Sequence, residues 1–145
     1  MPSKILLRED EIKYMALFEN VTGALAKDCI IDEKANRIIY VVKAGNVGLA
    51  IGKGGYNVKL LMRMINKNVE IVEFDEQPTD FIKNALAPAR INEVRITVRP
   101  DGRKIAVIAV EPKDKGVAIG KDGRTVERIR FLAKRYFEIS DVVIS

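Results

Sequence analysis

The sequence repeats one stretch, Gly48-Leu49-Ala50-Ile51-Gly52-Lys53-Gly54-Gly55, as Gly116-Val117-Ala118-Ile119-Gly120-Lys121-Asp122-Gly123. The two copies are offset by 68 residues, the separation of Gly52 from Gly120. The same offset also aligns flanking residues, which a chance glycine turn would not do. These aligned pairs are Val58 with Val126, Leu61 with Ile129, and Glu70-Ile71 with Glu138-Ile139. The repeated unit is therefore expected to be a domain that is used twice.

The repeat divides the 145 residues into two predicted domains, residues 1–75 and 76–145. Each is close to the smallest size that can support its own hydrophobic core. The chain is 48% hydrophobic and 31% charged, which is typical of folded proteins with a well-solvated surface. Lys43 and Asn46 interrupt the longest apolar candidate for a membrane span, and Glu9-Asp10-Glu11 is unlike a signal peptide. We therefore expect a cytoplasmic protein with no membrane partner.

The residues that most often perform catalysis or bind metals are scarce in this chain. It has no histidine, which removes the commonest general base and metal ligand, and its single cysteine cannot build a zinc site. Cys29 lies beside Ile30 and Ile31 and is expected to be a buried apolar residue. We assign no catalytic residue, no metal site and no cofactor, and we expect a protein that is not an enzyme.

The net charge of +5 is carried entirely by the second half of the chain. Residues 1–76 contain 11 basic and 11 acidic side chains, whereas residues 77–145 contain 14 and 9. A basic surface of this kind favours a polyanionic partner.

Both halves show the same predicted order of helices and strands. In the first half, apolar spacing predicts an opening helix from Glu9 to about Ala26, strands at 29–31 and 37–42, a short helix at 46–51, a helix after the glycine turn, and a strand at 69–74. In the second half, the corresponding elements are a helix at 80–87 capped by Thr79 or Asp80, strands at 94–99 and 104–110, the second turn, a helix and a final strand at 142–144.

This order and the doubled Ala-Ile-Gly-Lys-x-Gly motif resemble the type II K homology (KH) domain, and the tandem pair is similar to the archaeal NusA-like transcription factors. The resemblance implies an α+β fold with two tandem KH domains of order α-β-β-α-α-β. Each would be a small three-stranded sheet covered on one face by helices. The resemblance covers nearly the whole chain.

A Gly-x-x-Gly turn before a helix suits a phosphate backbone, because glycine allows close approach and the helix start presents free N–H groups. A mononucleotide P-loop is excluded, since three residues rather than four separate the glycines and no Ser or Thr follows Lys53 or Lys121. The KH resemblance implies that the turns clamp about four single-stranded nucleotides beside an apolar groove, for which Ile51 and Ile119 are candidate wall residues. The implied clamp residues are Gly52, Lys53, Gly54, Gly55, Gly120, Lys121, Asp122 and Gly123.

Basic residues on the helix after each turn are further candidates for contacts with phosphates. Helical spacing places Lys59 in the first half, and Arg124 and Arg128 in the second, on faces that continue from the turns. Asp122 differs from Gly54 in placing a negative charge inside the second turn. Phe131, Tyr136 and Phe137 are expected in the core of a helix, so stacking on aromatic rings should contribute little.

The resemblance implies a single-stranded RNA-binding protein that acts in transcription elongation, termination or antitermination. RNA polymerase or the elongation complex is the further partner it suggests, and it fixes neither the RNA sequence nor the oligomeric state. A ribosome-associated or RNA-processing factor is an alternative within the same class. A protein-interaction scaffold with purely structural glycine turns is an alternative of another class.

Overall fold

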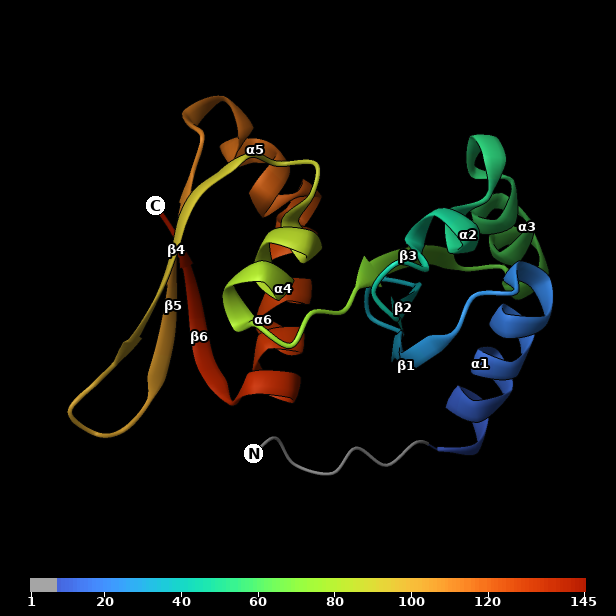
Figure 1. Ribbon diagram of the computed structural model, residues 1–145, viewed down its shortest axis with the longest axis horizontal. Coiled ribbons are helices and arrows are strands. Elements are labelled where there is room, and N and C mark those ends of the chain that lie inside the picture. The colour runs from blue at the N-terminus through green and yellow to red at the C-terminus, as the bar shows by residue number, and fades with distance from the viewer. Residues whose placement is uncertain (1–7) are drawn as a thin grey trace. The chain divides into compact units, whose positions relative to one another are not determined.

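The computed structural model describes residues 8–145, which form two compact units (Figure 1). The first unit ends at Asp75 and the second begins at Glu76. Among the described residues, no helix is both long enough and apolar enough to cross a bilayer.

The first unit consists of one small sheet with helices on one side of it (Figure 1). Strand β2 lies in the middle of the sheet, antiparallel to β1 and parallel to β3. The elements in chain order are α1 (Glu9–Thr22), β1 (Ala26–Asp32), β2 (Arg37–Val42), α2 (Val47–Ile51), a 3-10 turn (Lys53–Gly55), α3 (Tyr56–Ile65) and β3 (Asn68–Glu73).

The core of the first unit forms where α1 and α3 pack on β2. Phe18 of α1 stacks on the ring of Tyr40 with 4.3 Å between the ring centroids. The Tyr40 hydroxyl donates a hydrogen bond of 2.8 Å to the backbone oxygen of Tyr14, so its polar end is satisfied within the core. Cys29 is fully buried in the same cluster, which confirms the prediction for this residue.

The second unit repeats the arrangement of the first. Its sheet has the order β4-β5-β6, with β4 antiparallel and β6 parallel to β5. The predicted fold class, two α+β units of KH type, is therefore confirmed. The elements are α4 (Pro78–Leu86), β4 (Ile91–Val98), β5 (Lys104–Val110), a 3-10 turn (Pro112–Asp114), α5 (Lys115–Ile119), a 3-10 turn (Lys121–Gly123), α6 (Arg124–Phe137) and β6 (Ile139–Ile144).

Two predicted helix boundaries are wrong for local reasons. Helix α1 ends at Thr22 rather than near Ala26, because Gly23 takes a left-handed conformation (φ 74°) and donates its N–H to the oxygen of Glu19. Helix α4 begins at Pro78, one residue before Thr79, with Gln77 as its N-cap. Proline is favoured in the first turn because its missing N–H is not needed there.

The constant offset of the repeat fails after the second glycine turn. Helix α6 has 14 residues and α3 has 10, so the second copy contains an extra helical turn before its last strand. Strand register pairs Val69 with Ile38 and Val142 with Ala106, which makes Val69 and Val142 equivalent at an offset of 73 residues. The predicted match of Glu70-Ile71 with Glu138-Ile139 is therefore wrong, and Glu138 is instead the left-handed C-cap of α6.

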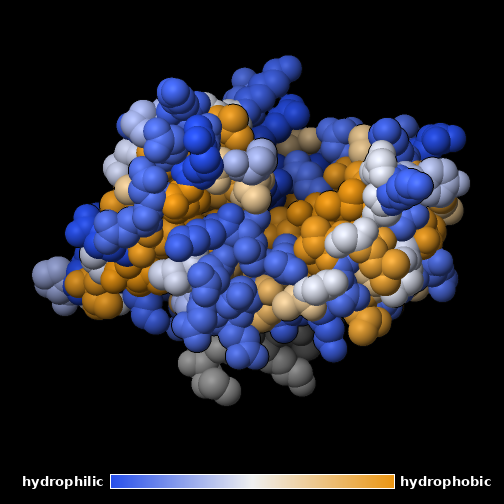
Figure 2. Space-filling view, turned by 45° about the horizontal axis from the view of Figure 1, so that its top comes forward, coloured by the Kyte–Doolittle hydropathy of each residue, from blue (hydrophilic) through white to orange (hydrophobic). Residues whose placement is uncertain are grey.

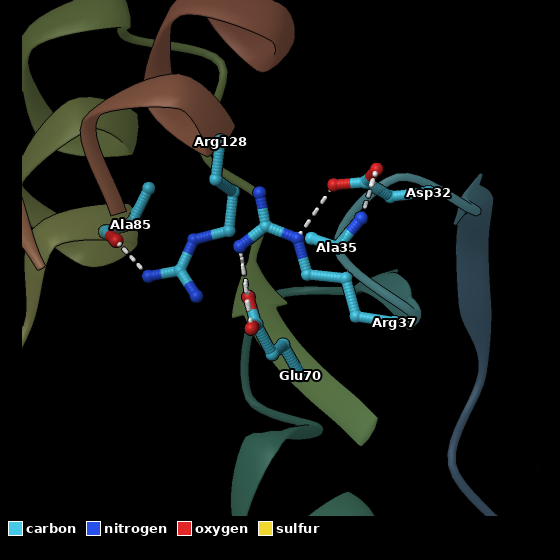
Figure 3. A network of polar contacts seen from close by, with 6 residues as sticks. All are labelled: Asp32, Ala35, Arg37, Glu70, Ala85 and Arg128. Carbon is cyan, nitrogen blue, oxygen red and sulfur yellow. Dashed lines mark hydrogen bonds and ion pairs between the residues drawn. The ribbon is translucent and has the colours of Figure 1, made fainter. Parts of the chain in front are cut away.

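A buried arginine joins the β1–β2 hairpin to β3 in the first unit (Figure 3). The Arg37 side chain is 4% exposed, and its Nε donates to Asp32 at 2.8 Å while its Nη1 lies 3.3 Å from the Glu70 carboxylate. Partial burial acts to raise the pKa of Asp32. Hydrogen bonds from Arg37 and from the backbone N–H of Ala35 outweigh that effect, so the pKa of Asp32 lies below its usual value.

Replacing Arg37 by methionine should lower the free energy of unfolding by about 3 kcal/mol, because it removes the buried guanidinium that Asp32 and Glu70 share. A carboxyl group whose pKa is lowered in the folded state stabilises the protein at pH values above its unfolded-state pKa. This stabilisation is lost as the pH falls through the folded-state pKa. Urea denaturation from pH 7 to pH 3 should therefore show a steeper acid loss for wild type than for R37M.

The matched control for R37M is R103Q, which breaks the exposed Arg103–Asp101 ion pair at the tip of the β4–β5 hairpin. Exposed ion pairs contribute little to stability, so R103Q should unfold at nearly the wild-type urea concentration. If R37M and R103Q lost the same free energy of unfolding, the buried position of Arg37 would add nothing to the stability that its ion pairs provide.

Candidate nucleic-acid interface

The first glycine turn joins α2 to α3 through a backbone that glycine adopts far more readily than other residues. Gly52 has φ 77° and ψ 167°, Gly54 has φ 63° and ψ 20°, and Gly55 has φ 77° and ψ 15°. The Gly52 N–H donates to the oxygen of Gly48 at 3.0 Å, and the Gly55 N–H donates to the oxygen of Gly52 at 3.0 Å. The first of these bonds ends α2, and the second forms the turn that leads into α3.

The second turn, between α5 and α6, reproduces this backbone almost angle for angle. Gly120 has φ 80° and ψ 166°, Asp122 has φ 56° and ψ 27°, and Gly123 has φ 73° and ψ 14°. Asp122 is therefore a non-glycine residue in the left-handed region, which aspartate tolerates better than most. The shared geometry shows that the repeat extends from sequence to backbone conformation.

The first glycine of each turn is required by crowding as well as by its dihedral angles. A Cβ at Gly52 would lie 3.0 Å from the backbone nitrogen of Asn57, and one at Gly120 would lie 2.8 Å from that of Thr125. A Cβ at Gly54, in contrast, would meet no atom within 4 Å among the described residues. The crowded glycine faces the protein and the middle of the turn faces open space.

Each turn leads directly into the N-terminus of a helix, and the first N–H of that helix is bonded within the turn. Tyr56 donates its N–H to the oxygen of Lys53, and Arg124 donates its N–H to the oxygen of Lys121. Helices α3 and α6 begin at Tyr56 and Arg124, with Gly55 and Gly123 as their N-caps. Because both N-cap residues are glycines, neither caps its helix with a side-chain hydrogen bond. The positive end of each helix dipole therefore lies at the turn, where it favours an anion.

Basic side chains surround the turns unequally. Lys53, Lys121, Lys59 and Arg124 are exposed beside their turns, as expected for contacts with phosphates. Arg128 is partly buried, and its Nη2 donates a hydrogen bond of 2.6 Å to the backbone oxygen of Ala85 in α4 (Figure 3). The Arg128 guanidinium thus fastens α6 to α4, which leaves it less available to RNA than sequence position alone suggests.

An open apolar groove of about 460 Å³ lies next to the first turn. Figure 2 shows apolar surface, in orange, on the part of the molecule that contains the first unit. Ile51, a predicted candidate for the groove wall, lies at the groove, and Met62, which the sequence did not single out as a site residue, is exposed there as well. The lining residues are Ile51, Gly55, Val58, Lys59, Met62, Val69 and Ile71.

The aromatic residues of α6 divide between core and surface. Tyr136 is buried and packs edge-to-face on Phe81 at 5.6 Å between ring centroids, as predicted for a core residue. Phe131 is 48% exposed, which corrects its predicted place in the core, and the Arg135 guanidinium lies 6.0 Å from its ring centroid. The longer α6 carries Phe131 on its outer face, where the shorter α3 has Arg63 at the matching position.

The duplicated fold and its paired glycine turns define a protein with two tandem KH domains. Residues 12–76 match the KH domain family, and residues 78–142 match the family described as the NusA-like second KH domain. The chain belongs to the family of archaeal NusA-like proteins with tandem KH domains.

Curated relatives match over the full length of this chain. A probable transcription termination protein NusA from Halococcus morrhuae is 37% identical, and the match covers 98% of this chain and 99% of the relative. A protein of the same name from Halobacterium salinarum is 39% identical, with 97% and 99% covered. The crystal structure of the protein APE1850 superposes with a TM-score of 0.86 at 38% identity, covering 96% of this chain and 100% of that one.

The variants G52A and G120A should each lose about 1–3 kcal/mol of unfolding free energy, because the added methyl group strains the left-handed backbone and meets Asn57 or Thr125. The matched variants G48A and G116A add the same methyl group one helical turn earlier. No described atom lies within 4 Å there, so each should gain up to about 1 kcal/mol from higher helix propensity. Urea denaturation distinguishes the two pairs, and similar changes in all four variants would refute the steric requirement.

Proposed function

We propose that this protein is a single-stranded RNA-binding factor that acts in transcription elongation, termination or antitermination. The observation that carries the proposal is the pair of Gly-x-x-Gly turns with the same backbone geometry, each leading directly into the N-terminus of a helix. The relatives named as probable transcription termination proteins support the transcriptional part of the proposal.

At each turn the RNA backbone would be held by hydrogen bonds and charge together. A phosphate has room to approach the backbone of the first turn at Gly54, since a Cβ there would meet no described atom within 4 Å. Lys53 and Lys121 add an exposed positive charge to each site. The bases of a strand held in this way point toward the adjacent groove, as in other KH domains.

Two weak clamps in one chain bind one RNA strand more tightly than either clamp alone. Once the first unit holds the strand, the second unit meets the same strand at a high effective concentration. Each clamp can therefore release a nucleotide segment quickly while the protein stays bound, which suits a factor that accompanies a growing transcript.

RNA polymerase or the elongation complex is the proposed protein partner, and the cytoplasm is the proposed place of action. We assign no catalytic role to any residue, because the turns are built to hold a backbone. Co-purification with polymerase rather than with ribosomal subunits is the observation that would separate transcription from a role in ribosome function.

Charge reversal in the turns should abolish RNA binding without unfolding the protein. The variants K53D/G54D and K121D give each turn an Asp-Asp pair, which repels phosphate. Fluorescence anisotropy with short single-stranded RNAs at two salt concentrations should show salt-dependent binding for wild type, with each lost phosphate contact reducing the salt slope by roughly 0.7. Binding that survives when both turns carry Asp-Asp pairs would leave the glycine turns structural and favour a scaffold.

The two copies also provide a reciprocal control, because Gly54 and Asp122 occupy matching places. G54D puts a negative charge into the first turn, and D122G removes it from the second. RNA affinity should fall in G54D and rise in D122G, while circular dichroism confirms that both remain folded. Opposite signs identify the charge in the turn as the cause, since both variants change only one side chain.

A further inference from the structure

Two residues that line the groove of the first unit, Lys59 and Met62, are replaced by residues of different charge in the second. Helices α3 and α6 begin after turns of the same geometry, so their first ten residues correspond at the offset of 68. Glu127 therefore takes the place of Lys59, and Arg130 takes the place of Met62. An apolar groove with one cation becomes a site that contains both a carboxylate and a guanidinium.

Arg130 holds a network that spans α6 and β6. Its Nη1 lies 3.0 Å from Glu127 Oε1, and its Nε lies 3.4 Å from Asp141 Oδ1. Its Nη2 donates at 3.5 Å to the backbone oxygen of Val142, the residue equivalent to the groove residue Val69. The Arg130 side chain is 44% exposed, so the network forms part of the protein surface and can be reached by a base.

From this network, and resting on the proposed RNA-binding function, we infer that the second unit recognises the hydrogen-bonding edge of a base and favours bases that carry an exocyclic amino group. Two carboxylates surround one guanidinium, so acceptors outnumber cations at this site. A carboxylate accepts hydrogen bonds from the amino group of cytosine, which is a known specific contact. Uracil presents a carbonyl oxygen at the same position, which a carboxylate repels.

The first unit lacks this chemistry at its groove. Val58, Met62 and Val69 offer apolar contact to the flat face of any base, and Lys59 is the single cation among the lining residues. Contacts of this kind hold a base without distinguishing its edges, because every base has an apolar face. The first unit thus holds bases of any kind, and the second unit selects among them.

The test compares ten-nucleotide oligocytidine with oligouridine at pH 7.5, two strands that share a backbone and differ at the amino or carbonyl group of the base. Wild type should bind oligocytidine about ten-fold more tightly, the effect of one hydrogen bond to a charged group. The variant E127L/R130M removes one charge of each sign and makes these two positions of the second unit apolar. The preference of this variant for oligocytidine should fall below about two-fold. The salt dependence of its RNA binding should match that of wild type, since the formal net charge is unchanged.

The same measurement in the K53D/G54D background isolates the second unit and should enlarge the wild-type preference. The control E9Q/K13Q removes an exposed ion pair on α1, also without changing the net charge, and should retain the wild-type ratio. Salt-dependent RNA binding with equal affinity for the two oligonucleotides, or with a preference for oligouridine, would overturn this inference and leave the proposed function standing. No binding of either oligonucleotide by wild type would overturn both.

Discussion

The structure depends on a steric constraint at the first glycine of each turn. Gly52 and Gly120 adopt a backbone that side chains resist, and a Cβ on either would press against the start of the next helix. Because these glycines allow the chain to reverse so tightly, the N-terminus of the following helix lies directly at the turn. The constraint that shapes the fold thus also sets the geometry of the turn that is proposed to hold a phosphate, and both copies share it.

The two copies share a backbone and differ in electrostatics. The first turn is electrically neutral at Gly54 and lies beside an apolar groove, whereas the second contains Asp122 and lies beside the network of Arg130. The excess positive charge of the chain lies in the second half, where it offsets the carboxylates near the turn. A duplicated domain can specialise in this way because side chains change without altering the geometry that holds the phosphate.

Much of this architecture could be predicted from the sequence, because glycine turns and apolar strands leave local signals. The β2 and β5 boundaries and the buried Cys29 follow directly from such signals. The extra turn of α6 could not be predicted, since the polar residues of that helix allow either length and only strand register shows the shift to Val142. The position of Met62 at the groove and the contact of Arg128 with α4 depend on tertiary packing. The spacing of residues along a helix does not specify such packing.

The central claim is that both glycine turns contact the same RNA strand, and amide NMR tests it most directly. Addition of a ten-nucleotide single-stranded RNA to the ¹⁵N-labelled full chain should shift the N–H signals of Gly54, Gly55 and Gly123 together with those of Tyr56 and Arg124. The shifts at the two turns should appear over the same range of RNA concentration, because one strand engages both. Shifts at other surfaces with both turns unchanged would contradict the account and return the glycine turns to a structural role.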